Sequence, residues 1–234
     1  VKAVIRELVS DGKLVYTNEF GSSFLEPSYN KPVRVSTHVV IKPSGHHYQP
    51  ESEEVVIQIK PGAAFGDGRH PTSRLAIRGI EYVLEKIKSD RPGDQSRVLD
   101  IGTGSGILIL VAVRMGIHQG LGIDIDPLAR SEAKENVLIN RLDDQIDISD
   151  QHLETIDGYF DLVTANLRYP TLKKMCPGLR KITNSGGFIV FSGIRSYELA
   201  DLIKAYARKN FHVLWKQIEL DWAGMVLYRL KGQD

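Results

Sequence analysis

A short glycine-rich segment, residues 102–106, is the first part of the sequence whose residue types could hold a ligand. It follows the strand-like run Arg97–Ile101 and carries Gly102, Gly104 and Gly106 directly before an apolar, helix-like stretch. Glycines at such a position let the backbone turn sharply and approach a ligand at the carboxyl end of a sheet strand. The pattern predicts a ligand-binding loop, with a glycine turn that only caps a helix as the alternative.

Charge at this loop distinguishes between two kinds of nucleotide ligand. The dinucleotide fingerprint G-x-G-x-x-G requires a glycine at position 107, where Ile107 stands. Asp100 would repel a pyrophosphate at the following helix N-terminus but would attract the sulfonium and ammonium groups of S-adenosyl-L-methionine. At ~4 Å and an effective dielectric of ~20, attraction and repulsion differ by about 8 kcal/mol before desolvation. We therefore predict S-adenosyl-L-methionine as the cofactor, with Asp100, Gly102, Gly104 and Gly106 among its contacts.

A second acidic position follows the next strand-like run, Gly120–Ile125. Asp124 stands near the end of this run, where an acidic side chain commonly accepts hydrogen bonds from ribose hydroxyls. Asp126 precedes Pro127 and is expected to cap the next helix. We predict that Asp124 and Ile125 contact the cofactor; a capping role for Asp124 is the alternative.

Asn166 is the candidate catalytic residue, because it directly follows the strand-like run Asp161–Ala165. From there an amide oxygen could accept a hydrogen bond from an incoming amine and hold its lone pair in line with the S–CH₃ bond. A turn-forming asparagine is the alternative. The run Asn166–Tyr169 is distantly similar to the N-P-P-Y pattern used for planar nitrogens, but both prolines are absent.

The elements that must position these residues form an alternating series. Strands are predicted at Arg97–Ile101, Gly120–Ile125, Asp161–Ala165 and Gly187–Ser192, and helices at Gly106–Met115, Pro127–Asn140, Thr171–Ile182 and Tyr197–Lys209. Two further strands, Phe211–Glu219 and Gly224–Leu230, must pair antiparallel because only a short turn joins them. The alternation predicts an α/β fold with a mostly parallel sheet and helices on both of its faces.

The residues before this series divide into two further parts, which gives domains at residues 1–30, 31–60 and 61–234. In the first, apolar residues at helical spacing, a stop at Gly12 and strands at Leu14–Thr17 and Ser22–Leu25 predict a helix-hairpin appendage. A winged-helix remnant and an appendage without DNA function are both open interpretations. The second is a β linker, with strands at Val33–Ile41 and Val55–Ile59.

A glycine-rich loop, Lys60–Thr72, joins the linker to a helix over Ala76–Ile87. Its His70 and Asp67 are candidates for a supporting role in proton transfer, with loop shaping as the favoured alternative. In the linker, His46 and His47 have no ligand partner at a recognisable spacing, so we expect exposed loop histidines and no metal site.

Bulk composition is that of a soluble globular protein. The chain has 234 residues with 30 Lys+Arg and 29 Asp+Glu, so net charge gives no global attraction to nucleic acid or membrane. The one cysteine, Cys176, excludes an internal disulfide, and no apolar run approaches a membrane span. These features predict a cytoplasmic protein with no membrane partner. The chain begins at Val1 rather than a methionine, which is typical of a cropped or processed terminus.

The loop before the first long helix carries a family resemblance. Lys60–Ser73 reads KPGAAFGDGRHPTS and resembles the pattern D-P-G-x-A-F-G-T-G-x-H-x-T-T of the PrmA family, which methylates amino groups of a large-subunit ribosomal protein. The similarity runs from about Lys31 to Lys231 and includes Val98–Gly106, Gly122–Pro127, Ala165–Leu167, Gly186–Gly187, Ser192–Ile194 and Asp221–Trp222.

The resemblance implies a Rossmann-like class I methyltransferase fold with a seven-stranded sheet. It also implies cofactor contacts at the Ser73 hydroxyl, the Gly102 loop, Asp124 and Asn166, with Phe65 covering the cofactor and Thr72 beside it. The sequence departs from the family at several positions. Ser73 replaces a threonine but keeps the hydroxyl, Asp67 replaces a threonine and adds a charge, and Tyr169-Pro170 stand where smaller residues are usual. Residues 1–30 do not resemble the family's substrate-recruiting domain.

Our mechanistic hypothesis is direct in-line transfer of a methyl group from S-adenosyl-L-methionine to a neutral amine. The resemblance implies that this amine is a lysine or N-terminal amine of a ribosomal large-subunit protein. Three alternatives stay open: a lysine of a different protein, a planar nitrogen, and a cofactor-sensing regulator that binds DNA through residues 1–25.

Overall fold

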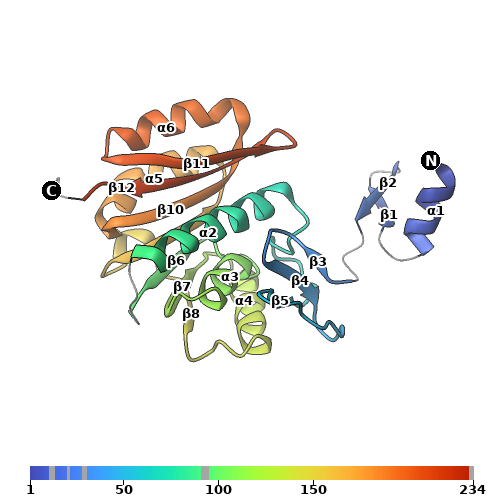
Figure 1. Cartoon of the computed structure of the whole chain (residues 1–234). Helices are drawn as coiled ribbons and strands as arrows, with labels where there is room; N and C mark the ends of the chain where they lie inside the picture. Colours follow the sequence, from blue (N-terminus) through green and yellow to red (C-terminus); the bar gives the residue numbers. More distant parts are fainter. Residues whose placement is uncertain (11–13, 20–21, 28–30, 91–94, 232–234) are drawn as a thin grey trace.

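A seven-stranded sheet forms the centre of the computed structural model, which describes residues 1–10, 14–19, 22–27, 31–90 and 95–231 (Figure 1). In spatial order its strands are β11 (Phe211–Glu219), β12 (Trp222–Arg229), β10 (Thr183–Arg195), β9 (Phe160–Asn166), β6 (Arg97–Ile101), β7 (Gln119–Ile123) and β8 (Ile146–Ser149). Strand β12 runs antiparallel to both of its neighbours, and the other pairs are parallel. The predicted mostly parallel sheet with an antiparallel C-terminal strand is confirmed.

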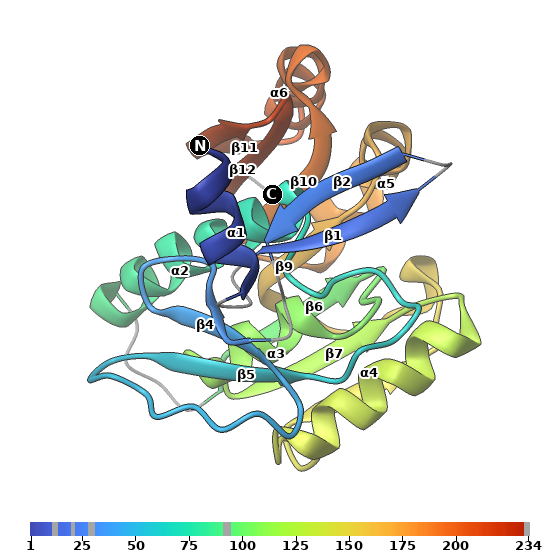
Figure 2. The same cartoon turned by 90° about the vertical axis from the view of Figure 1, so that its right-hand side faces the viewer.

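Helices cover both faces of this sheet (Figures 1 and 2). One apolar cluster joins the sheet to α2 (Pro71–Asp90), α3 (Ile107–Arg114) and α4 (Pro127–Ile139). A second cluster joins the opposite face to α5 (Tyr169–Ile182) and α6 (Leu199–Ala207). In α3 every residue from Ile107 to Val113 is buried, as expected for a helix that is apolar on all sides. Single-turn helices lie at η1 (Leu153–Thr155) and η2 (Ser196–Glu198).

A small three-stranded sheet packs against the first cluster. It consists of β3 (Val33–Arg34), β4 (Val39–Pro43) and β5 (Val55–Ile59), with β3 antiparallel and β5 parallel to β4. Its buried residues, among them Val35, Ile41 and Ile57, belong to the same core cluster as α2 and α3. The domain boundaries at residues 30 and 60 stay a prediction.

The prediction of one continuous strand over Val33–Ile41 is wrong, because the chain turns at residues 35–38. The turn wraps around Glu81 of α2, whose side chain is 6% exposed. Its carboxylate accepts hydrogen bonds from the Ser36 hydroxyl (3.1 Å) and from the backbone N–H of His38 (2.7 Å). A buried carboxylate needs such donors, and an extended strand could not supply them together.

Other differences concern element ends and one missed strand. No strand was predicted at β8, because its four residues, Ile-Asp-Ile-Ser, alternate over too short a length to stand out. The predicted strand Gly120–Ile125 ends earlier, at Ile123, so Asp124 lies just beyond β7. Strand β10 is longer than the predicted Gly187–Ser192, and α6 is shorter than the predicted Tyr197–Lys209.

The N-terminal part contains the predicted helix and hairpin. Helix α1 (Lys2–Ser10) precedes the antiparallel pair β1 (Leu14–Glu19) and β2 (Ser22–Pro27), beside the main body in Figure 1. The proposed helix stop at Gly12 lies outside the described residues. Within the described ranges, no helix is both long and apolar enough to cross a bilayer.

Candidate functional site

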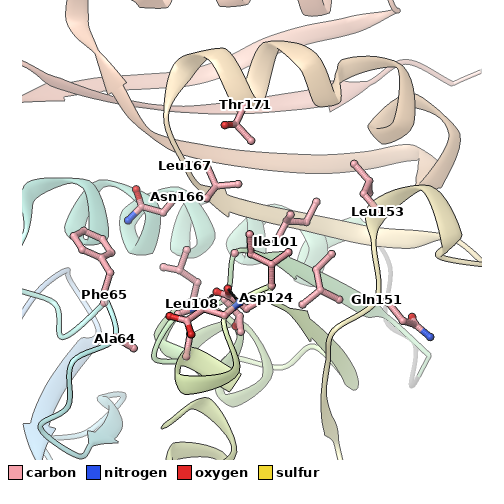
Figure 3. Close-up of a pocket in the computed structure, with 18 of the residues that line it drawn as sticks. Ala64, Phe65, Ile101, Leu108, Asp124, Gln151, Leu153, Asn166, Leu167 and Thr171 are labelled. Carbon is pink, nitrogen blue, oxygen red and sulfur yellow. Dashed lines mark hydrogen bonds between the residues drawn. The ribbon is translucent and has the colours of Figure 1, made fainter. Parts of the chain in front are cut away.

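A cavity of about 620 Å³ opens at the carboxyl ends of β6, β7 and β9 (Figure 3). Its volume is in the range of small-molecule and cofactor sites. Its walls come from the Phe65 loop, the glycine loop, the end of β7, the segment after β8 and the start of α5; they include Ala64, Phe65, Ile101, Gly102, Thr103, Gly104, Leu108, Asp124, Ile125, Gln151, Leu153, Asn166, Leu167 and Thr171. In Figure 3, Phe65 and Asn166 lie on one side and Gln151 and Leu153 on the other.

The glycine loop is shaped by positive φ angles and by close backbone approach. Gly102, Gly104 and Gly106 have φ angles of 68°, 55° and 83°, a region that favours glycine. A Cβ atom on Gly104 would lie 2.4 Å from the carbonyl oxygen of Phe65. Glycine at this position therefore lets the Phe65 loop pass directly over the glycine loop.

The N–H groups of the glycine loop already have acceptors within the protein. Gly102 and Thr103 donate to the carbonyl of Ile123, Gly104 donates to the Asp124 carboxylate at 3.0 Å, and Ser105 donates to the carbonyl of Phe65. Dinucleotide-binding loops instead offer such N–H groups to a pyrophosphate. The loop is therefore arranged for a ligand without phosphate.

Asp124 stands at the rim of the cavity with both carboxylate oxygens engaged. They accept from the N–H groups of Gly104 and Asp126, each at 3.0 Å. Asp126 is the N-cap of α4 and accepts from Leu128 N at 2.9 Å, with Pro127 in the first turn, as predicted. The two bonds hold the Asp124 carboxylate in the cavity wall, where it has acceptor capacity left for a ligand.

Asp100 lies beneath the glycine loop and outside the cavity lining. It is 1% exposed and accepts from the hydroxyls of Thr103 (2.7 Å) and Thr164 (2.6 Å). Burial raises the pKa of this carboxyl to about 6, and the two hydroxyl bonds oppose part of that rise. Through these two hydrogen bonds, Asp100 links its own strand β6 to Thr103 of the glycine loop and to Thr164 of β9.

An aromatic row leads away from the cavity. The rings of Phe65 and His70 are 5.4 Å apart, those of His70 and Trp222 are 5.0 Å apart, and the Arg195 guanidinium lies 3.8 Å above the Trp222 ring. Burial, followed by the charges of Arg74 and Arg195, lowers the pKa of His70. The row thus presents a neutral imidazole between two aromatic rings at neutral pH.

The two hydroxyls at the start of α2 are buried behind this row. Thr72 is 2% exposed and lies 2.8 Å from Nδ1 of His70, which it holds in place. Ser73 is 1% exposed, and its Oγ has no hydrogen-bond partner among the described residues. An unpaired buried hydroxyl costs about 1–3 kcal/mol of folding free energy, so a ligand atom or a water is expected to supply the missing hydrogen bond.

Six of the ten predicted site residues line the cavity, and the other four are not part of its lining. The lining ones are Phe65, Gly102, Gly104, Asp124, Ile125 and Asn166; the others are Thr72, Ser73, Asp100 and Gly106. Gly106 is the N-cap of α3.

Asp67 pairs with Arg69, and the loop residues His46 and His47 are exposed, as expected for the histidines. The described residues contain no cluster of three or more His, Cys, Asp or Glu side chains able to hold a metal.

Two α4 residues and the C-cap residue of that helix, all missed by sequence reasoning, bind the Phe65 loop and the end of β5. Glu132 accepts from the N–H groups of Ala63 (2.8 Å) and Ala64 (2.9 Å). Asn136 bridges Lys60 N and Ser105 O, and Asn140 bonds both backbone groups of Gln58. Their spacing of four residues places them on one face of α4. This four-residue spacing of polar residues was the available sequence signal, but a solvent-exposed helix face has the same spacing.

Comparisons with known proteins point to one family. The family model "Ribosomal protein L11 methyltransferase (PrmA)" matches residues 25–229. A protein of that name from Geobacter sulfurreducens is 37% identical over 201 residues, 86% of this chain and 63% of the relative. One from Clostridium perfringens is 34% identical over 194 residues, 83% of this chain and 59% of the relative. The chain thus spans about three fifths of the length of these curated relatives.

Solved structures share the fold. A ribosomal protein L11 methylase from Lactobacillus delbrueckii superposes with a TM-score of 0.75 at 32% identity, covering 86% of this chain and 99% of that one. Magnesium protoporphyrin IX methyltransferase from Synechocystis, solved with bound S-adenosylmethionine, gives a TM-score of 0.55 at 16% identity over 73% of this chain and 86% of that one. At that identity the second likeness shows the fold alone.

Proposed function

Because this chain belongs to the ribosomal protein L11 methyltransferase (PrmA) family, we propose that it transfers methyl groups from S-adenosyl-L-methionine to amino groups of a ribosomal large-subunit protein, L11. The acceptors are lysine or N-terminal amines. We also propose a cytoplasmic location, which a ribosomal protein substrate supports.

One observation carries the cofactor proposal: the backbone N–H groups of the glycine loop bind protein acceptors, while a carboxylate faces the cavity. Asp124 suits ribose hydroxyls, and the glycine turn admits a flat nucleoside without offering an anion site. Phe65, 55% exposed at the rim, has an aromatic face available to cover the ligand. The unpaired Ser73 hydroxyl is a further candidate contact.

The bound cofactor supplies an electrophilic methyl group on a sulfonium. Asn166, at the end of β9, is the residue we assign to the acceptor amine. Its amide oxygen would accept a hydrogen bond from a neutral amine and aim the amine lone pair into the cavity. A lysine amine with a pKa of about 10.4 must first lose its proton, and the apolar surroundings of Leu167 and Phe65 favour the neutral form. Positioning of this kind can lower a barrier by about 7–11 kcal/mol.

Two measurements test the proposal separately. Titration calorimetry with S-adenosyl-L-methionine and its demethylated product should show binding, and NADH should show none. Labelled cofactor, incubated with a purified ribosomal large-subunit protein fraction, should then transfer label to L11. Tight NADH binding would refute the cofactor assignment. Cofactor binding followed by label on another protein would leave the chemistry standing and refute the substrate. The proposal that residues 1–25 bind DNA stays a prediction.

A further inference from the structure

Two arginines stand beside the part of the cavity that contains Asn166. Arg168 is exposed and directly follows Leu167, which lines the cavity, and Arg195 is the last residue of β10. Strand β10 runs parallel to β9, and its Ser192 is the register partner of Asn166. Arg195 therefore lies three residues beyond Asn166 in the direction of the carboxyl edge of the sheet.

The two chain segments that carry these arginines are in direct contact. A Cβ atom on Gly193 would lie 2.4 Å from the carbonyl oxygen of Leu167. Gly193 also has a φ angle of 83°, in the region that favours glycine. Glycine at this position lets the residue before Arg168 approach the turn that leads to Arg195, so both arginines emerge from neighbouring loops.

An aromatic ring fixes the position of the Arg195 guanidinium. The guanidinium lies 3.8 Å above the ring of Trp222, which is the register partner of Arg195 in β12. Trp222 belongs to the aromatic row that leads through His70 to Phe65 in the cavity wall. Contact with an aromatic face uses the flat side of a guanidinium and leaves the N–H donors in its plane available. Arg195 is therefore held in place with donors to spare.

Neither arginine has a carboxylate partner among the described residues, whereas Arg74, at the same edge of the sheet, binds Glu219. The Glu198 carboxylate near Arg195 accepts from the backbone N–H of that residue at 2.8 Å. At the start of α5, the Arg168 side chain makes no capping hydrogen bond. Two cations on neighbouring loops without counter-charges attract an anion.

The cavity itself has the opposite charge. The charged side chains of its lining, Asp124, Asp126 and Glu154, are all carboxylates. A carboxylate of the substrate is repelled from such a cavity, whereas an amine is attracted to it. The two arginines lie outside the lining, where their guanidinium groups can bind a carboxylate through paired hydrogen bonds. This distribution of charge sorts the groups of a substrate that carries both an amine and a carboxylate.

We propose that Arg168 and Arg195 bind an acidic side chain of the protein substrate close to the acceptor amine, and so select which amines are methylated. The inference rests on the proposed function, because it concerns the acceptor of the same reaction. An extended chain spans about 3.3–3.6 Å per residue, and Arg195 lies three strand residues beyond Asn166, so the acidic residue is expected within about three positions of the acceptor. The two arginines are specificity residues, since neither contacts the reacting atoms.

The test compares two short labelled peptides that differ only in charge. Each has one central lysine, flanked on both sides by glutamate in one peptide and by the isosteric glutamine in the other. Fluorescence anisotropy, with the demethylated cofactor bound, measures the affinity of the protein for each peptide. The unaltered protein should bind the glutamate peptide about tenfold more tightly, because bidentate bonds between a guanidinium and a carboxylate are strong. In Arg195→Gln this ratio should fall below about threefold.

Three further variants control for folding and for charge. Arg168→Gln removes no hydrogen bond of the fold and should lower the ratio as well. Arg195→Lys should keep only part of the preference, because an ammonium cannot bind a carboxylate through a guanidinium fork. Arg208→Gln is the matched control and should keep the full ratio. It removes an exposed arginine after α6, at the opposite edge of the sheet, where β11 begins.

Equal affinity for the two peptides, no binding of either, an unchanged ratio in Arg195→Gln or Arg168→Gln, or a matching loss in Arg208→Gln would overturn the proposal. Labelled cofactor, incubated with both peptides and with L11, tests the proposed function separately. Methyl transfer together with equal binding of the peptides would leave that function standing and refute the selection. Binding of the glutamate peptide through the arginines, without methyl transfer to the peptides or to L11, would refute the function and leave the carboxylate site standing.

Discussion

Three aspartates within 27 residues have three different roles. The burial and the hydrogen bonds of each side chain distinguish these roles. Asp100 is fully buried under the glycine loop, Asp124 lines the cavity, and Asp126 caps α4. The sequence predicted the last two roles from position alone. It predicted Asp100 as a cofactor contact, and that role stays a prediction beside the hydroxyl bonds that the structure shows.

Replacing Asp124 by alanine should weaken binding of S-adenosyl-L-methionine at least about tenfold, because one charge-assisted hydrogen bond contributes about 1.5–3 kcal/mol. Calorimetry measures the affinity. Asp143→Ala, which removes an exposed carboxylate outside the cavity lining, is the control and should leave the affinity unchanged. Equal affinity for Asp124→Ala and the unaltered protein would remove Asp124 from the site.

Asp100 should make stability depend on pH. Its folded-state pKa of about 6 exceeds the ordinary value of 3.8, so ionisation is harder in the folded state. The stability associated with its protonated form is present below pH ~4 and lost as the pH rises through ~6, by roughly 3 kcal/mol. Urea unfolding measures the free energy of unfolding of Asp100→Asn and of the unaltered protein. The variant should gain stability relative to the unaltered protein when the pH is raised from 4 to 7. A difference independent of pH would contradict this.

Asn166→Ala should spare cofactor binding and lower turnover, because the amide oxygen is assigned to the amine and not to the nucleoside. Loss of one orienting hydrogen bond predicts a fall in kcat of about ten- to a hundredfold. Asn166→Asp, which keeps an acceptor oxygen, should recover part of the rate. Unchanged turnover of the alanine variant on L11 would show that another group orients the amine.

At the scale of elements, α4 serves as the support for the Phe65 loop. Its Glu132, Asn136 and Asn140 bind the backbone of residues 58–64, just before Phe65. Gly62 is required under this arrangement, because a Cβ there would lie 2.1 Å from the Glu132 carboxylate. Family resemblance identified the loop, but the partner of its backbone lies about 70 residues later and could not be identified without the fold.

Glu132→Ala should loosen this loop and weaken cofactor binding about tenfold, because two backbone N–H groups lose a charged acceptor. Glu132→Gln, which retains one acceptor oxygen, should recover part of the affinity. Glu135→Ala removes only the exposed pair with Lys60 and is the control, with little effect expected. Hydrogen exchange at Ala63 and Ala64 should rise in the alanine variant alone; unchanged exchange and affinity would dismiss α4 as the support.

At the scale of the whole molecule, the sheet has two functions. Its carboxyl edge brings together loops that are far apart in the chain, from Phe65 to Thr171, around one cavity. It also separates the helices into two groups, with α2, α3 and α4 on one face and the basic helices α5 and α6 on the other. Right-handed crossovers between parallel strands produce both results, since they place successive helices on the two faces.

Residue patterns were enough to predict the α/β class, the antiparallel end of the sheet, the glycine loop, and Asp124 and Asn166 as candidate site residues. These features are local, because hydrophobic period, glycine spacing and strand ends are written in neighbouring residues. The folded structure was needed to show that the loop N–H groups already have acceptors, that Asp100 is buried and that Glu132 binds the Phe65 loop. Those facts depend on contacts between residues distant in the chain, and such contacts exist only once the core has packed.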